Sequence, residues 1–74
     1  MKAKIKLFAT LRNGRFDIKE MDLEEGTTIL NITEHLGIEK KDAAILFING
    51  VHAEPDSVIK EGDDVAIFPP VGGG

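Results

Sequence analysis

The residues best suited to do chemistry lie at the carboxyl end, which runs Phe68-Pro69-Pro70-Val71-Gly72-Gly73-Gly74. Each proline holds its φ near −65°, so the pair gives a stiff, extended lead to the last residues. Glycine has no Cβ, so a glycine tail could enter a tunnel in another protein that is too narrow for other residues. The pattern predicts a flexible tail over residues 71–74, with the terminal carboxylate of Gly74 as the reactive group. From the glycines alone, a frayed chain end is the alternative, because termini are often poorly ordered.

Other residue types restrict the chemistry further. The chain has no cysteine, one serine and two histidines, so it lacks a thiol nucleophile, a thiolate metal ligand and the material for a catalytic triad. The histidines have no paired metal-ligand spacing, and we expect no bound metal. We therefore do not expect the chain to be an enzyme by itself.

The charge is divided unevenly along the chain. Residues 1–19 hold six basic side chains and one acidic one, whereas residues 20–74 hold three lysines and twelve carboxylates, for a net charge of −4. An acidic protein is a poor nucleic-acid binder, because such binding depends on neutralising many phosphates. The acidic half, including Glu61 and Asp63, instead favours a partner with a basic surface, which we expect to meet the sheet near Phe68 as well.

Nothing in the sequence indicates a membrane or an export signal. The longest apolar run, residues 43–48, is far shorter than the ~20 residues of a membrane span. No basic-then-apolar leader opens the chain. We expect a cytoplasmic protein, and its length allows one small domain over residues 1–74 that ends in the glycine tail.

The first elements that must position the tail form a predicted hairpin. Apolar residues occupy every odd position from Ala3 to Leu11, and Lys2, Lys4 and Lys6 occupy the first even positions, which is the period of a half-buried strand. Asn13-Gly14 then favours a two-residue type I′ turn, which sets Leu11 opposite Phe16 and Ala9 opposite Ile18. The apolar phase afterwards shifts to Met21 and Leu23, which predicts a bulge near Lys19-Glu20 or an early end to the pairing.

A helix and a second hairpin are predicted next. Thr27 or Thr28 can cap a helix that runs from about residue 28 to residue 36 and stops at Gly37. Residues 38–43 could hold a further helical turn. Residues 44–48 form an apolar run typical of a strand well inside a sheet, and Asn49-Gly50 predicts a second type I′ turn.

The last predicted strand covers residues 65–68, and the proline pair stops it because proline cannot donate to the ladder. Phe68 is out of phase with Val65 and Ile67, so it either lies exposed on the far face of the sheet or packs against the sheet's own edge. The predicted core consists of Ile5, Leu7, Phe16, Ile29, Leu36, Leu46, Val65 and Ile67.

The ending EGDDVAIFPPVGGG, residues 61–74, resembles that of the MoaD/ThiS sulfur-carrier family of ubiquitin-like proteins. The proline pair before the glycines is most similar to the small subunit of molybdopterin synthase. The tight Asn13-Gly14 connection and Gly72, where that subunit often has alanine, leave room for a relative with another acceptor. The resemblance implies an α+β fold, the β-grasp roll, in which one main helix packs on one face of a mixed sheet of four or five strands. Its first and last strands lie side by side in the centre.

The resemblance also implies a mechanism in which partner proteins do the hard steps. An adenylyltransferase of the ubiquitin-activating type uses ATP to adenylate Gly74, with Gly73 beside it in the reactive end. A sulfur-donor protein then converts the terminus to a thiocarboxylate. Delivery of that sulfur to a molybdopterin precursor, for the molybdenum or tungsten cofactor, takes place in the larger synthase subunit. We expect partners to bind through Phe68, Pro69, Pro70, Val71 and Gly72, and we expect the chain itself to bind no cofactor stably.

Three other interpretations remain open on the sequence. The sulfur could serve thiamin synthesis, tRNA thiolation or another pathway. The activated glycine could instead be passed to a lysine amine, as in a ubiquitin-like protein modifier. The chain could also be a non-catalytic β-grasp interaction domain with an inert tail.

Overall fold

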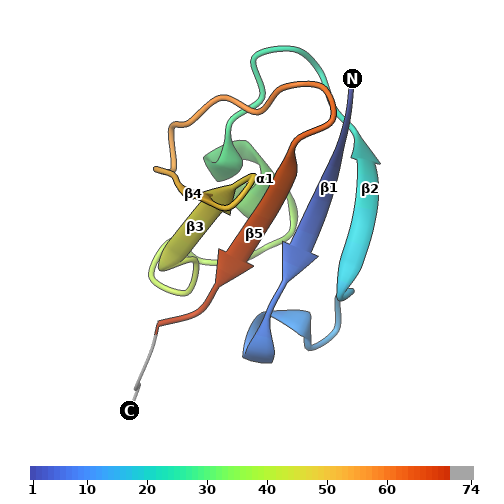
Figure 1. The fold of residues 1–74 in the computed structure, drawn as a ribbon. Helices are drawn as coiled ribbons and strands as arrows, with labels where there is room; N and C mark the ends of the chain where they lie inside the picture. Colours follow the sequence, from blue (N-terminus) through green and yellow to red (C-terminus); the bar gives the residue numbers. More distant parts are fainter. Residues whose placement is uncertain (71–74) are drawn as a thin grey trace.

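A computed structural model describes residues 1–70, in which one mixed sheet carries a helix on one face (Figure 1). The strands are β1 (Lys2–Leu7), β2 (Ile18–Asp22), β3 (Ile45–Ile48), β4 (Val51–His52) and β5 (Asp64–Phe68). A short 3₁₀ helix, η1 (Ala9–Arg12), follows β1, and the α-helix is α1 (Ile29–His35). Within residues 1–70, no helix is long and apolar enough to cross a membrane.

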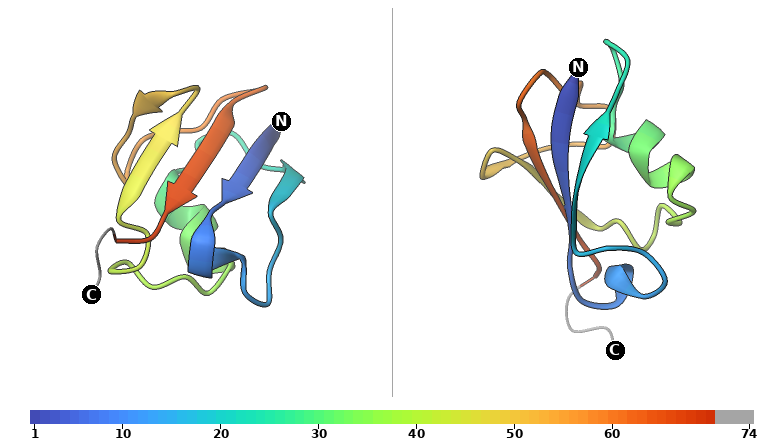
Figure 2. Two further views of the ribbon diagram at one scale, coloured as in Figure 1. Left: turned by 60° about the horizontal axis from the view of Figure 1, so that its bottom comes forward. Right: turned by 90° about the vertical axis from the view of Figure 1, so that its right-hand side faces the viewer.

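The strand order is β2-β1-β5-β3-β4. β1 and β5 lie in the centre and are parallel, with Ile5 opposite Val65 and Leu7 opposite Ile67, while the other neighbours are antiparallel. Both views in Figure 2 show α1 on one side of the sheet. The α+β class and the β-grasp arrangement are therefore confirmed, with five strands and the first and last of them paired in the centre.

The core lies between the sheet and α1. Six of the eight predicted core residues are buried, and the buried set also includes residues that the prediction missed, among them Leu11, Ile32, Ile38 and Ile59. Phe16 and Leu36 are only partly buried and pack at the margin of the core, so their prediction was too strong. Phe16 lies in the connection before β2, and Leu36 is the C-cap residue of α1, so neither lies within an element.

Helix α1 begins and ends where the sequence predicts. The Thr28 hydroxyl accepts a hydrogen bond from the Asn31 N–H at 3.2 Å, and the Asn31 side chain accepts one from the Thr28 N–H at 2.9 Å. This reciprocal capping box satisfies two donors that the helix leaves free. Gly37 then takes a φ of +73°, which ends the helix at little steric cost. Residues 38–43 form a hydrogen-bonded turn from Glu39 to Asp42 and not a further stretch of helix.

The predicted first hairpin is wrong in both its turn and its register. β1 ends at Leu7, and residues 8–17 form a longer connection that contains η1. Asn13 has a φ of −59°, whereas a type I′ turn needs positive φ at both central residues. With Gly14 at +71° and an Arg15 N–H to Arg12 carbonyl hydrogen bond of 2.9 Å, the segment matches a type II turn.

The register of β1 and β2 follows from this longer connection. Lys6 pairs with Ile18, and the pairing continues without interruption to Lys2 and Asp22. The expected bulge and the expected early end of the pairing are therefore both wrong. The apolar phase shifts because Phe16 precedes the strand and Ile18 lies on the face away from α1, where it is 59% exposed.

The second hairpin forms as predicted. Asn49 and Gly50 both have positive φ, +53° and +78°, and Ile48 pairs with Val51 across the two-residue turn. β3 is less buried than its apolar run suggests, because only Leu46 is fully enclosed. The reason is that α1 covers one face of the sheet, so alternate residues of β3 face away from the core.

Candidate functional site

The face of the sheet opposite α1 leads directly into the tail. Because strand residues alternate between faces, this open face carries Lys4 and Lys6 from β1, Phe47 from β3, and Asp64, Ala66 and Phe68 from β5. We use the term open face for these residues together with Phe8, which follows β1. Its last member along β5, Phe68, immediately precedes the prolines.

Three phenylalanines form a cluster on the open face. The rings of Phe8 and Phe68 are stacked, with centroids 4.1 Å apart and planes 10° apart. Phe47 meets Phe68 edge to face, with centroids 5.9 Å apart. Such pairs contribute about 0.5–1.5 kcal/mol beyond the area they bury. Phe68 therefore lies on the far face, as one prediction stated, and also packs against its own sheet, as the alternative stated, so it is half-buried.

Beside the cluster lies a shallow pocket of about 340 Å³. Its floor is Ala66, and its walls include Phe47, Phe68 and the ion pair between Lys6 and Asp64, whose Nζ and Oδ2 atoms are 2.9 Å apart. The pair leaves no net charge at this point, so the pocket presents mainly apolar surface. A partner side chain of apolar character fits it, because aromatic and apolar anchors in such pockets are the usual centres of interfaces.

The backbone fixes the point at which the tail leaves the sheet. The Phe68 carbonyl accepts a hydrogen bond from the Ala44 N–H at 3.0 Å, and the Ile67 carbonyl accepts one from the Phe8 N–H at 3.2 Å. The next residue, Pro69, cannot donate, so the ladder ends there. Pro69 is half-buried and Pro70 is exposed.

The structure thus brings together three of the predicted site residues, Phe68, Pro69 and Pro70. The predicted partner-binding residues Val71 and Gly72 and the predicted reactive residues Gly73 and Gly74 lie outside the described part of the chain. Their roles stay predictions.

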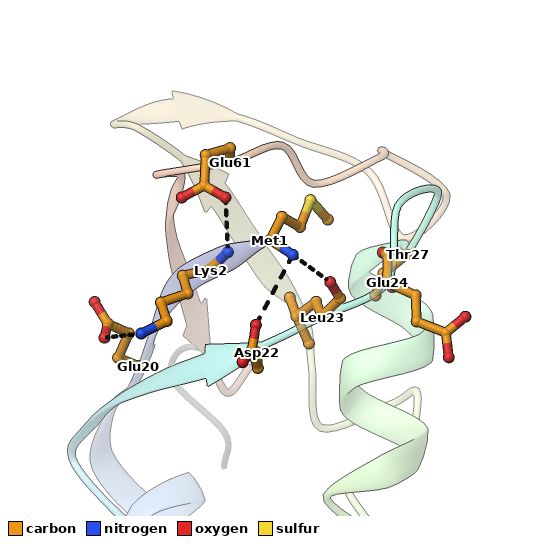
Figure 3. Close-up of polar contacts among 8 residues, drawn as sticks. All are labelled: Met1, Lys2, Glu20, Asp22, Leu23, Glu24, Thr27 and Glu61. Atoms are coloured by element: carbon orange, nitrogen blue, oxygen red, sulfur yellow. Dashed lines mark hydrogen bonds and ion pairs between the residues drawn. The ribbon is translucent and has the colours of Figure 1, made fainter.

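The acidic residues that we expected to join Phe68 in one docking face lie elsewhere. Glu61 and Asp63 precede β5, whereas Phe68 ends it. Glu61 accepts a hydrogen bond from the Lys2 backbone N–H at 3.0 Å, as Figure 3 shows. The Asp63 carboxylate accepts one from the Asn49 side chain at 2.9 Å and one from the Lys60 N–H at 2.8 Å. Both carboxylates stabilise turns at the opposite end of the sheet from the tail.

Sequence reasoning missed Phe8 and Phe47 as parts of this site. The available signal was an aromatic residue in the outward phase of a strand, where a lysine or another polar residue is usual. Arg12 was missed as well. Its guanidinium carbon lies 5.5 Å from the centroid of the Phe8 ring, and its Nε donates to the Leu7 carbonyl at 2.8 Å. Arg12 therefore contacts the Phe8 ring from η1 and ties η1 to the end of β1.

No three His, Asp or Glu side chains among residues 1–70 lie close enough together to hold a metal ion. The arrangement on this part of the chain is thus an apolar docking surface next to the start of the tail.

Comparisons with known proteins point to one family. The sequence model of the ThiS family matches residues 5–74. A protein assigned as subunit 1 of molybdopterin converting factor from Pyrococcus furiosus is 31% identical, with 96% of this chain and 99% of that chain covered and a TM-score of 0.74. SAMP1 from Haloferax volcanii is 26% identical over 100% of both chains, with a TM-score of 0.76.

A more distant likeness concerns the fold alone. A chain in the protein–protein complex of subunits 1 and 2 of molybdopterin-converting factor from Helicobacter pylori is 16% identical over 100% of both chains, with a TM-score of 0.64. No curated protein matches the chain in sequence.

Proposed function

The chain belongs to the ThiS family of ubiquitin-like sulfur carriers and modifiers, and from that membership we propose that Gly74 carries sulfur as a terminal thiocarboxylate. The observation that carries the proposal is the end of β5. There the phenylalanine cluster of the open face, centred on Phe68, leads through Pro69-Pro70 into the glycine ending. This is the arrangement that a carrier needs, because docking and delivery have to be joined by a short, fixed link.

The chemistry begins with activation of the carboxylate, which is a poor electrophile. A Gly74 carboxylate oxygen attacks the α-phosphorus of ATP on an adenylyltransferase of the ubiquitin-activating type, and pyrophosphate leaves. The terminal sulfur of a persulfide on the donor protein then attacks the acyl carbon, and AMP leaves. A thiol breaks the resulting acyl disulfide, which releases the thiocarboxylate. ATP is thus a substrate of the partner, and the carrier holds no cofactor stably. Because these donors and ATP are cytoplasmic reactants, we place the protein in the cytoplasm.

The chain's own residues dock and position, and they are not catalytic alone. The open face binds the partner through Phe68 and its neighbours, while Pro69, Pro70, Val71 and Gly72 line the entry to the partner's site. Gly73 and Gly74 then reach the reacting atoms. The hydrogen bond from Ala44 to the Phe68 carbonyl holds the start of the tail, so that the reach of the terminus is set by the number of residues after it.

We further propose molybdopterin synthesis, for the molybdenum or tungsten cofactor, as the destination of the sulfur. The 31% identity to a protein assigned as subunit 1 of molybdopterin converting factor supports this choice, as does the proline pair before the glycines. In this proposal the chain is the small subunit of molybdopterin synthase. Its acceptor is the larger subunit, by analogy with the complex of subunits 1 and 2 from Helicobacter pylori.

A second candidate is conjugation to proteins. SAMP1 from Haloferax volcanii, which matches over 100% of both chains, is named as a small archaeal modifier protein. Conjugation uses the same adenylate, but a lysine amine attacks the acyl carbon and an isopeptide bond forms. Mass spectrometry of the protein recovered from cells distinguishes the two candidates: a terminal thiocarboxylate indicates sulfur delivery, and an isopeptide adduct indicates conjugation.

The experiment that tests both candidates alters only the terminus. We expect deletion of Gly74, addition of one alanine after Gly74, and Gly73→Ala each to impair ATP–pyrophosphate exchange with the cognate activating enzyme. Misplacing a reacting group by about 1 Å can cost ~100-fold in rate. The thermal midpoint should stay at the parent value in all three variants, because the changes come after Ile67, the last residue of the core cluster in sequence. Normal exchange by the alanine-extended protein would overturn the carrier and the modifier proposals together and leave an inert domain.

A further inference from the structure

The edge of the sheet formed by β2 carries backbone groups that are free to pair. Among residues 1–70, β2 pairs only with β1. Met1 and Leu23 exchange both backbone hydrogen bonds, at 2.8 and 2.7 Å, and the Leu7 N–H donates to the Asp17 carbonyl at 2.9 Å. Hydrogen-bonded and non-hydrogen-bonded pairs alternate along an antiparallel ladder. Residues 19 and 21 therefore bond to β1, while residues 18, 20 and 22 direct their N–H and C=O groups to the outside.

The outward groups of these three residues, Ile18, Glu20 and Asp22, take no part in the loop, turn or side-chain hydrogen bonds of the described chain. An extended segment laid along this edge could thus form a regular ladder with three donors and three acceptors. Such strand addition is a common mode of peptide recognition, in which backbone bonds give affinity and side-chain pockets give selectivity.

A pocket of about 230 Å³ lies beside this edge, between β2 and α1. Met21 and Leu23 line it from the strand side and Ile32 from the helix, and its remaining lining residues are polar: Asp22, Glu24, Thr27, Asn31 and His35. The right-hand view of Figure 2 looks toward this edge and shows α1 next to β2. Side chains of an added strand that point to the α1 side would enter this pocket. Because Met21, Leu23 and Ile32 supply its apolar surface, every second residue of that strand should be apolar.

The other face of the edge is acidic. The side chains of Glu20 and Asp22 are 63% and 80% exposed on this face, which also carries Ile18 at the start of β2. Opposite charges directly across a pair of strands stabilise the pairing, and like charges destabilise it. Side chains of an added strand that point to the open side should therefore be basic.

β1 already shows this pattern on the inner side of β2. Lys2 is opposite Asp22 and Lys4 is opposite Glu20, with Ala3 between them facing the core. The Lys2 Nζ atom lies 3.9 Å from a Glu20 carboxylate oxygen (Figure 3). On its inner side, β2 thus pairs with a strand, β1, in which basic and apolar residues alternate.

A second copy of the chain fits this edge poorly. In an antiparallel pair of two β2 edges, centring on Glu20 sets Glu20 opposite itself, and centring on Met21 sets Glu20 opposite Asp22. Centring on Lys19 sets Lys19 opposite itself. Each of these registers brings like charges together. Centring on Ile18 instead leaves Glu20 and Asp22 opposite residues that precede β2, so little of the strand would pair. A different protein is therefore the better occupant.

We propose that the β2 edge docks an extended segment of a partner protein in which lysine or arginine alternates with aliphatic residues of valine or leucine size. This goes beyond the proposed sulfur transfer and does not depend on it. Asp22 and the pocket lie at the end of the sheet where β5 begins, whereas the tail leaves from the end of β5. Both surfaces can be occupied at once.

The test uses the full chain labelled with ¹⁵N and an acetylated, amidated peptide of sequence Lys-Val-Lys-Val-Lys-Val-Lys. On binding, amide exchange should slow at Ile18, Glu20 and Asp22, whose N–H groups point outward. It should change little at Lys19 and Met21, which already bond to β1. The matched peptide Glu-Val-Glu-Val-Glu-Val-Glu should leave the spectrum unchanged.

Charge reversal on the protein adds a second readout. We expect Glu20→Lys to weaken binding of the lysine peptide about fivefold, since a favourable and an unfavourable cross-strand pair differ by about 1 kcal/mol. The control Asp56→Lys makes the same charge change at an exposed turn after β4 and should leave the affinity at the parent value. The dispersion of the amide spectrum shows that each variant is folded.

Three outcomes would overturn the proposal. The first is the absence of alternating protection along β2 at saturating lysine peptide. The second is equal binding of the glutamate peptide, and the third is an equal effect of Glu20→Lys and Asp56→Lys. All three are independent of the terminus, so they bear on this edge and leave the sulfur-carrier proposal as it was.

Discussion

The two Asn-Gly dipeptides of this chain have the same local preference and different structures. Asn49-Gly50 forms the two-residue turn that the dipeptide favours, with both φ values positive. Asn13-Gly14 does not form this turn. Asn13 has a φ of −59°, and β1 ends at Leu7 whereas β2 begins only at Ile18. The difference shows that the turn preference of a dipeptide decides a connection only where no long-range contact opposes that turn.

Long-range contacts compete at the first connection. Leu11 is 4% exposed and part of the core, which draws residues 9–12 out of the strand. The Arg15 guanidinium donates to the carbonyls of Leu36 and Gly37 at the end of α1, at 3.0 and 3.2 Å, and to that of Leu11 at 3.2 Å. A tight hairpin would extend Leu11 along the sheet and forfeit these contacts.

The largest expected effect concerns this buried leucine. Leu11→Ala should lower the free energy of unfolding by about 2–4 kcal/mol, because it removes apolar contact and leaves a cavity. The matched change in the second hairpin, Val51→Ala, affects a side chain that is 67% exposed and should cost less than about 0.5 kcal/mol. Urea denaturation of both variants measures the difference. Equal midpoints would show that the first connection does not depend on the core.

The next prediction concerns the residue that the first connection contributes to the open face. Phe8→Ala should weaken binding to the activating enzyme about 30-fold, mainly through faster dissociation, as loss of a packed aromatic anchor does. Val51→Ala serves again as the control, since Val51 lies on the edge strand β4 and not in the Phe8–Phe68 cluster. Surface plasmon resonance gives both rates. Unchanged dissociation of Phe8→Ala would move the docking face elsewhere.

Arg15→Ala should cost about 1–2 kcal/mol of stability. The substitution removes charge-assisted hydrogen bonds to three carbonyls, two of them at the C-terminal end of α1, where a positive charge is favourable. Lys41→Ala is the control, because the one ion pair of Lys41 within residues 1–70 is with the exposed Glu39 carboxylate, at 3.9 Å. Thermal melts at low and high salt compare the two. A loss no greater than that of Lys41→Ala would contradict the role given to Arg15.

The smallest effect separates the two asparagines. Asn49→Ala should cost about 1 kcal/mol, since alanine disfavours a φ of +53° and the Asn49 side chain bonds to the Asp64 N–H at 2.9 Å. Asn13→Ala should cost less than about 0.5 kcal/mol, because Asn13 has an ordinary negative φ. Chemical denaturation resolves this order, and the reverse order would mean that the turn types have been exchanged.

Parts of the fold could be predicted because they depend on neighbours in sequence. The alternation from Lys2 to Leu7 identified β1 and its buried side. Thr28 and Gly37 marked the ends of α1 through capping and a positive φ, both of which act within a few residues. The candidate site was predicted in part for the same reason, since Phe68, Pro69 and Pro70 stand together in the chain.

The remainder depended on contacts between distant residues. Phe8 and Phe68 are sixty residues apart in sequence and become neighbours only because β1 and β5 pair in parallel. Ile59 gives no periodic signal, yet it is 1% exposed, and its N–H donates to the Thr27 carbonyl at 2.8 Å. Glu61 and Asp63 precede Phe68 by only a few residues in sequence, but they lie at the other end of the sheet because β5, between them and Phe68, is extended.

The sequence by itself determined the strand periodicity, the capped helix, the second turn and the membership that its ending indicates, because each rests on local backbone preference or on a contiguous motif. The tertiary structure alone decided the length and register of the first connection, the aromatic cluster of the open face and the outward phase of the β2 edge. The alignment of β1 and β2 depends on the burial of Leu11 and on the hydrogen bonds from Arg15 to the end of α1. Both exist only once the whole chain is packed.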